Sequence, residues 1–162
     1  MPEPVEDQTE LAAALGRIPS GLFIITVRHE DQSTGMLASW VQQCSFQPPL
    51  ITVAINQQRA VLDWLRIGTQ FTVNVLAEGS RQLVSHFGKG FELNQPAFTG
   101  LEVHNDQSVP PILLSSHAYL VCQVVERVVT GDHVLLIGEV MAGRVLQSAH
   151  PAVHIRKSGL KY

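Results

Sequence analysis

Small side chains beside a tryptophan mark the first segment that could do chemistry. Residues 35–40 read Gly-Met-Leu-Ala-Ser-Trp. Small residues let a planar ring approach the backbone, Ser39 can donate a hydrogen bond, and Trp40 offers an aromatic face for stacking. This segment could therefore hold a flat ligand. The alternative interpretation is that Trp40 is an ordinary core residue.

A polar turn marks the second segment. Residues 56–60 read Asn-Gln-Gln-Arg-Ala and join a predicted strand to a predicted helix. The free N–H groups of a helix start, with an arginine beside them, suit a phosphate. Gln57, Gln58, Arg59 and Ala60 are therefore candidate phosphate contacts, and Lys89, which stands between two glycines, is another. The alternatives are an exposed turn with a solvated arginine and a plain flexible loop.

A histidine lies at the predicted tip of a long hairpin. Gly131 and Asp132 separate two apolar runs, and His133 opens the second run. A histidine at such a tip can orient a substrate or exchange protons, because its pKa lies near neutrality. His133 is therefore a candidate catalytic residue. The alternative is that His133 is a turn residue with no further role.

The elements that must position these side chains are mostly strands. Apolar runs and alternating patterns predict strands over 22–27, 36–46, 50–55, 71–76, 118–129 and 133–146. We expect a turn over 31–35, short helices over 11–17, 60–67 and 80–87, with Ser80 as N-cap, and a long functional loop over 88–110. There is no regular β-α-β alternation. The pattern therefore predicts an all-β fold with a few short helices, an antiparallel barrel.

Composition and missing motifs exclude several classes of protein. The chain has 162 residues, of which only 15% are charged, and its net charge of −3 argues against nucleic acid as a partner. It has no apolar run long enough to span a membrane, and its acidic start is no secretory signal, so we expect a cytoplasmic protein. It has no dinucleotide-binding glycine motif, phosphate-binding loop, hydrolase elbow or zinc motif, and Pro151 separates His150 from His154, so no metal is predicted. Cys44 and Cys122 are expected to be buried, reduced thiols.

Taken in order, several segments resemble the flavin reductase-like, FMN-binding split-barrel family. The resemblance covers residues 11–162, while residues 1–10 are expected to be a disordered N-terminal segment. Within the family, the likeness is to the flavin reductase domain at the C-terminus of cyanobacterial flavodiiron proteins, through residues 36–41 and 152–162. The other matching segments are Arg17–Val27, Cys44–Ile55, Gly68–Leu76 and Gly131–His133.

The resemblance implies an NAD(P)H:flavin oxidoreductase, a homodimeric split barrel that reduces FMN by hydride transfer, with FAD as the other flavin. It places residues 37–40 against the flavin ring, Gln43, Cys44 and Ser45 along the ribityl chain and phosphate, and residues 57–60 with Lys89 at the phosphate. His133 matches a histidine near the nicotinamide.

Two alternative functions stay open at this stage. Many relatives carry a second hydroxyl residue in place of Trp40, and the tryptophan-containing branch includes carriers that retain FMN. The chain could therefore be an FMN-binding electron carrier that passes electrons to a partner protein, or a structural barrel without flavin. The sequence also does not choose between NADH and NADPH.

Overall fold

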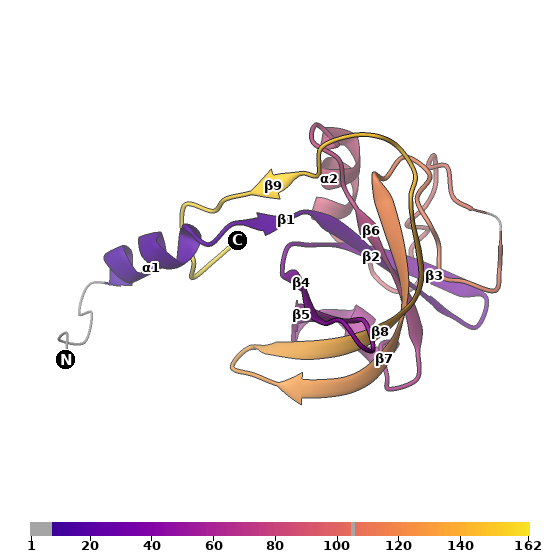
Figure 1. Cartoon of the computed structure of the whole chain (residues 1–162), viewed down its shortest axis with the longest axis horizontal. Coiled ribbons are helices and arrows are strands. Elements are labelled where there is room, and N and C mark those ends of the chain that lie inside the picture. Colours follow the sequence, from indigo (N-terminus) through magenta and orange to yellow (C-terminus); the bar gives the residue numbers. More distant parts are fainter. Residues whose placement is uncertain (1–7, 105) are drawn as a thin grey trace.

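The computed structural model describes residues 8–104 and 106–162, and its largest unit is one antiparallel sheet (Figure 1). Two short α-helices and one 3-10 helix accompany the strands. In chain order the elements are α1 (Gln8–Gly16), β1 (Ser20–Gly21), β2 (Phe23–His29), β3 (Gln32–Ala38), β4 (Val41–Ser45), β5 (Leu50–Asn56), η1 (Ala60–Asp63), β6 (Gln70–Val75), α2 (Arg81–Gly88), β7 (Ala118–Val129), β8 (His133–Val145) and β9 (Val153–His154).

The main sheet has seven strands in the order β3-β2-β6-β7-β8-β5-β4. All of its neighbouring strands are antiparallel. Its two edge strands, β3 and β4, follow each other in the chain and are separated only by Ser39 and Trp40. The sheet must therefore curl until its edges meet at this point, although they do not pair along their length. This is the split antiparallel barrel that the sequence predicts.

The barrel interior is filled from strands that carry branched and aromatic side chains. Along β5, buried and half-buried residues alternate, as expected for a strand with one face inward. Ile25, Val53, Phe71, Val73 and Leu136 are nearly or fully inaccessible. In the long β7–β8 hairpin, two register shifts let the strands bend around this core.

A second apolar cluster lies on the other side of the sheet, under α2. Leu83 and Phe87 of the helix pack against Ile24 and Leu76. Phe87 approaches β3 so closely that a Cβ on Gly35 would lie 2.9 Å from its ring. Gly35 thereby sets how near the end of α2 comes to β3. Ser80 precedes α2 as predicted, but its side chain makes no capping hydrogen bond.

Buried polar groups hold the loop that follows α2. Asn74 is fully buried; its side chain donates to the carbonyl of Ile24 at 3.1 Å and accepts from the N–H of Leu113 at 2.8 Å. Thr72 donates to the carbonyl of Pro110 at 3.1 Å. The loop is thus fixed to the sheet at its end.

The two ends of the described chain form an arm that extends from the barrel (Figure 1). β1 pairs with β9, and α1 packs on residues 156–159, where a Cβ on Gly159 would lie 2.0 Å from the Cβ of Leu15. The N–H of Gly159 donates to the carbonyl of Ala12 at 2.6 Å. Neither short strand was predicted, because two residues carry no periodic signal.

Several boundaries differ from the sequence prediction. The first helix begins at Gln8, so residues 8–10 of the predicted disordered segment are helical, and residues 1–7 lie outside the described residues. The predicted turn over 31–35 mostly belongs to β3, because Glu30 adopts a positive φ and reverses the chain earlier. The predicted helix over 60–67 is only η1. Cys44 is exposed, contrary to prediction, whereas Cys122 is buried, which raises its pKa to about 12.

Candidate functional site

A cavity of about 330 Å³ opens where β3 ends, beside the last residues of β5 and the end of α2. This volume is within the range of small-molecule pockets. Most of its lining is apolar. It is lined by Leu22, Met36, Leu37, Ala38, Ser39, Ala54, Ile55, Asn56, Arg59, Val84, Phe87, Gly88, His154 and Tyr162.

Three of the predicted ring contacts, Leu37, Ala38 and Ser39, line this cavity. They do so because β3 ends at Ala38, where the chain crosses to the opposite edge of the sheet. The N–H of Ala54 donates to the carbonyl of Trp40 at 3.0 Å and holds this crossing against β5. The result is a wall of small and aliphatic residues suited to a flat, apolar group.

The turn at residues 56–60 is arranged differently from the prediction. The N–H of Gln57 donates to the carbonyl of Asp132, the N–H of Gln58 to Asn56 Oδ1, and the N–H of Arg59 to the carbonyl of Asn56, at 2.9–3.0 Å. These N–H groups are therefore not free to bind phosphate. Gln57, Gln58 and Ala60 are exposed and do not line the cavity.

Arg59 is the cationic group of the cavity lining. Within the described chain no carboxylate pairs with its guanidinium, since the ion pair found there joins His133 and Asp132. A Cβ on Gly90 would lie 3.5 Å from Arg59 Nη1, so the loop after α2 passes next to it. Lys89 is exposed and stands between Gly90 and the cavity-lining Gly88. One end of the cavity is therefore suited to an anion.

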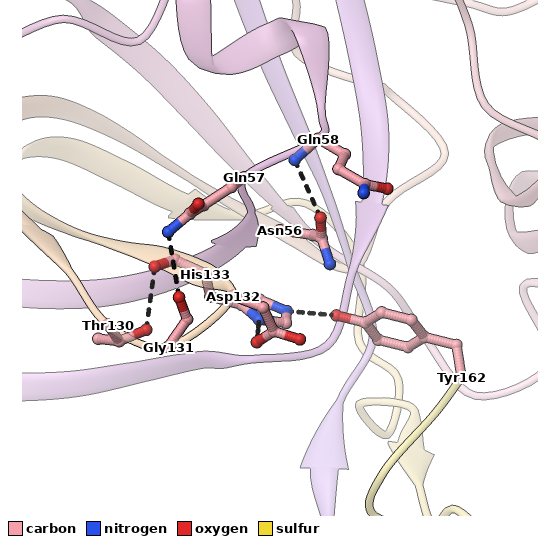
Figure 2. A network of polar contacts seen from close by, with 8 residues as sticks. All are labelled: Asn56, Gln57, Gln58, Thr130, Gly131, Asp132, His133 and Tyr162. Carbon is pink, nitrogen blue, oxygen red and sulfur yellow. Dashed lines mark hydrogen bonds and ion pairs between the residues drawn. The ribbon is translucent and has the colours of Figure 1, made fainter.

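The predicted catalytic histidine lies at the start of β8, directly opposite Asn56 of β5. Its Nδ1 donates to Asp132 Oδ1 at 2.6 Å, and its Nε2 lies 3.1 Å from the hydroxyl of Tyr162 (Figure 2). Its own hydrogen bond with the imidazole lowers the pKa of Asp132. His133 is only 7% exposed, and it does not line the cavity. Tyr162 lies between them.

Trp40 also lies next to the cavity without lining it. Its ring contacts the rings of His133 and Tyr162, with centroids 4.8 and 5.9 Å apart, and the Arg156 guanidinium lies 4.9 Å from its centroid. It is half-buried, so it is neither a core residue nor a cavity wall. Trp40, His133 and Tyr162 form what we call the aromatic cluster.

The sequence reasoning assigned no role to Tyr162, His154 or Arg156. They reach the site because β9 pairs with β1 and because the N–H of Ala152 donates to the carbonyl of Leu76 at 2.9 Å. No spacing or motif signals this path. The only available signal was the match of residues 152–162 to the resembled domain.

Gln43, Cys44 and Ser45 are not brought to this cavity. β4 runs antiparallel to β5, so that Ser45 pairs with Leu50, at the end of β5 remote from Asn56. Gln43 instead lines a second cavity of about 320 Å³. The other residues of this second cavity are Phe23, Val41, Gln42, Pro49, Leu50, Ile51, Val73, Val75, Leu120 and Val140.

The described residues contain no group of three potential ligands that could hold a metal ion. Over the same part of the chain, no helix is long and apolar enough to cross a membrane.

Residues 15–159 match the family described as flavin reductase like domain. The chain is 43% identical over 155 residues to the putative diflavin flavoprotein A 3 of Nostoc sp., covering 94% of this chain and 27% of that protein. It is 40% identical over 156 residues to diflavin flavoprotein A 1 of Synechocystis sp., covering 95% and 27%. The chain thus spans about 27% of the length of these curated relatives.

Solved structures share the fold. The NADH:FAD oxidoreductase SgcE6 of Streptomyces globisporus C-1027 superposes with a TM-score of 0.83 at 21% identity, covering 95% of this chain and 91% of that one. The flavin reductase PheA2 gives a TM-score of 0.78 at 26% identity, covering 92% and 94%. The predicted split-barrel fold is thereby confirmed.

Proposed function

Because the chain belongs to the flavin reductase like domain family, we propose that it is an NAD(P)H-dependent oxidoreductase that binds FMN and reduces it by hydride transfer. The observation that carries this proposal is an arginine, Arg59, at one end of an otherwise mostly apolar cavity, with no carboxylate of the described residues paired to it. A flavin mononucleotide combines a flat ring system with an anionic end. The cavity presents a complementary set of groups.

The residues present fit such a molecule. We propose that the small and aliphatic wall at Leu37, Ala38 and Ser39 lies against the ring, with Ser39 able to donate a hydrogen bond. Arg59 contacts the phosphate, and Lys89 of the neighbouring loop adds a second cation. An arginine–phosphate contact is charge-assisted, so it is stronger than a neutral hydrogen bond. When bound, the flavin supplies the acceptor for a hydride from NADH or NADPH.

His133 is the proposed catalytic residue beside that cavity. Asp132 accepts a hydrogen bond from the Nδ1–H group. This bond fixes the orientation of the ring and the tautomer of a neutral imidazole. Nε2 is then an acceptor that can orient the amide of a nicotinamide. Trp40 packs on the imidazole and restricts its rotation.

The test is the absorbance spectrum of freshly purified protein, followed by anaerobic titration with NADH and NADPH. We expect FMN to bind and its visible absorbance to bleach on addition of either nucleotide. Absence of flavin reduction by both nucleotides would contradict the proposal.

One observation favours a second candidate, an FMN-binding electron carrier that retains its flavin. Both ring nitrogens of His133 already have partners, Asp132 and Tyr162. A protein of this kind would be yellow as purified, slow to oxidise NAD(P)H, and rapidly reduced by a partner protein. The two candidates are separated by whether the bound flavin is reduced faster by nucleotide or by the partner.

We also propose that the chain forms a homodimer. The arm exposes apolar side chains, including Ile18, Val153 and Ile155, each more than half accessible. With only 15% charged residues, the chain has little polar surface to keep such an arm solvated. Sedimentation equilibrium at micromolar concentration should give a dimer, and a stable monomer there would contradict this.

A further inference from the structure

Tyr162 reaches the site from a segment distant in sequence from the rest of the cavity. Its side chain lines the cavity, and its hydroxyl lies 3.1 Å from His133 Nε2 (Figure 2). Its ring centroid is 5.9 Å from that of Trp40 and 6.5 Å from that of His133. Tyr162 therefore stands between His133 and the space where a ligand would bind.

The roles in this hydrogen bond follow from the partners. A carboxylate only accepts, so Nδ1 of His133 is protonated and donates a hydrogen bond to Asp132 Oδ1 at 2.6 Å. In the neutral imidazole Nε2 is then an acceptor, and the Tyr162 hydroxyl donates to it. A phenol, whose ordinary pKa is about 10, keeps that proton at neutral pH. No nitrogen of His133 is left for a substrate.

Tyr162 is held by few contacts. It is 74% exposed, and the segment that carries it forms no strand after β9. Its anchors lie further back, where Arg156 sits over Trp40 and Gly159 donates to Ala12. The last residues can therefore swing away while the anchored part of the segment stays in place.

We propose that Tyr162 competes with the nicotinamide for His133 and so lowers the affinity of the protein for its nucleotide, an inference that rests on the proposed function. The amide N–H of a nicotinamide donates to Nε2 as the tyrosine hydroxyl does, so it replaces that hydroxyl one for one. A ligand group without a donor leaves Nε2 unpaired. Because displacing Tyr162 costs the same whichever nucleotide enters, Tyr162 lowers the apparent affinity for NADH and NADPH alike.

The size of this competition depends on how often Tyr162 leaves His133. If only a fraction of the molecules have Tyr162 displaced, the apparent affinity for the nucleotide is the intrinsic affinity multiplied by that fraction. One neutral hydrogen bond shifts such an equilibrium roughly two- to tenfold. Removing Tyr162 should therefore tighten nucleotide binding by about that factor.

The first experiment needs no nucleotide. Whole protein is treated with diethyl pyrocarbonate, and modification of each histidine is followed by peptide mass spectrometry. Tyr162→Ala and Tyr162→Phe should both speed modification of His133, roughly two- to tenfold for loss of one hydrogen bond. The matched control is Tyr119→Phe, which changes the other tyrosine of the chain. An unchanged rate at His133 in both Tyr162 variants overturns the inference.

The second experiment measures the dissociation constants of NAD⁺ and NADP⁺ on FMN-loaded protein. Tyr162→Ala should lower the constant of the preferred nucleotide several-fold, with the FMN constant unchanged. Equal or weaker nucleotide binding in this variant overturns the role of Tyr162 alone. Binding of neither nucleotide by wild type and variants alike overturns the proposed function itself, so the two failures are distinguishable.

Discussion

The two ends of β5 carry two cavities of nearly equal volume and different chemistry. At the Asn56 end, the cavity is lined by Ser39, Arg59 and Tyr162 among apolar residues. At the Leu50 end, the cavity is lined by aliphatic and aromatic residues, with two glutamines as its polar groups. Size therefore does not tell them apart. The two cavities differ in whether a charged side chain lines them and in which elements supply the lining residues.

The difference follows from how the chain arrives at each end. The polar groups at the Asn56 end come mainly from the crossing at Ser39, the turn at Arg59 and the C-terminal segment with His154 and Tyr162, most of which need not alternate between inside and outside. The Leu50 end is lined mainly by strands β2, β4, β6, β7 and β8, whose inward positions are set by packing. Residues on loops held by a rigid scaffold commonly carry function. The Asn56 end is thus the candidate site, and the Leu50 end is part of the core.

The largest expected effects are those of alanine substitutions at two isoleucines on the same strand, β5. Ile51 and Ile55 are 4% and 1% exposed and line the second and the first cavity, respectively. Each change to alanine should lower the free energy of unfolding by about 2–4 kcal/mol, as for other buried isoleucines. Only Ile55→Ala should also weaken FMN binding. Urea unfolding and FMN titration of the folded variants check this, and equal loss of FMN affinity in both would break the comparison.

The next effect concerns the charge of the Asn56 end. Arg59→Ala should weaken FMN binding by about 1.5–3 kcal/mol, or roughly ten- to hundredfold, because a charge-assisted contact is lost. Gln43→Ala, at the second cavity, should leave the FMN dissociation constant unchanged. Arg66→Ala is the matched control, since it removes another exposed arginine that lines neither cavity. An unchanged constant for Arg59→Ala would refute its role at the phosphate.

The sequence allowed the fold to be predicted well. Apolar runs and alternating patterns located β2, β5, β6, β7 and β8, because a strand with one buried face must repeat every second residue. The single strand predicted over 36–46 is instead two, β3 and β4, because the chain crosses to the other sheet edge at Ser39 and Trp40. The errors occur where tertiary contacts decide, as with β1 and β9, which exist only through their mutual pairing. The helix predicted over 60–67 shortens to η1, because the packing of this segment against the barrel outweighs its local helical periodicity.

The candidate site was predicted only in part. Leu37, Ala38, Ser39 and Arg59 line the cavity as a local reading of the sequence suggested. Gln43, which the resemblance placed beside the ribityl chain and phosphate, lines the second cavity instead of the first, because β4 runs away from Ser39 and Trp40. Tyr162 was missed because it lies 29 residues from His133, and no local pattern records that contact.

A smaller effect is expected from His133. His133→Ala should lower the rate of FMN reduction about two- to tenfold, the value of one neutral hydrogen bond, and change FMN affinity less. The hairpin tip should persist, because Thr130 binds the backbone carbonyl of His133 and not its ring. Stopped-flow reduction by NADH and NADPH measures the rate, with His104→Ala in an exposed loop position as control. If both constants stay at wild-type values, His133 is only a turn residue.

The smallest effect is a pH dependence at the same hairpin tip. The hydrogen bond from His133 lowers the pKa of Asp132 below its ordinary value of 3.8. Above pH 3.8 the carboxylate is charged in folded and unfolded chains alike, so its full contribution to stability is present. As the pH falls below 3.8, the unfolded chain takes up the proton first, so this contribution is lost progressively until the pH has passed the folded-state pKa.

Asp132→Asn should therefore lose less stability than wild type on acidification from pH 5 to about pH 3. Asp31→Asn, which removes an exposed carboxylate from the β2–β3 turn, is the control. Urea midpoints across this range check it, and parallel curves for wild type and Asp132→Asn would show that the carboxylate does not hold the imidazole in solution.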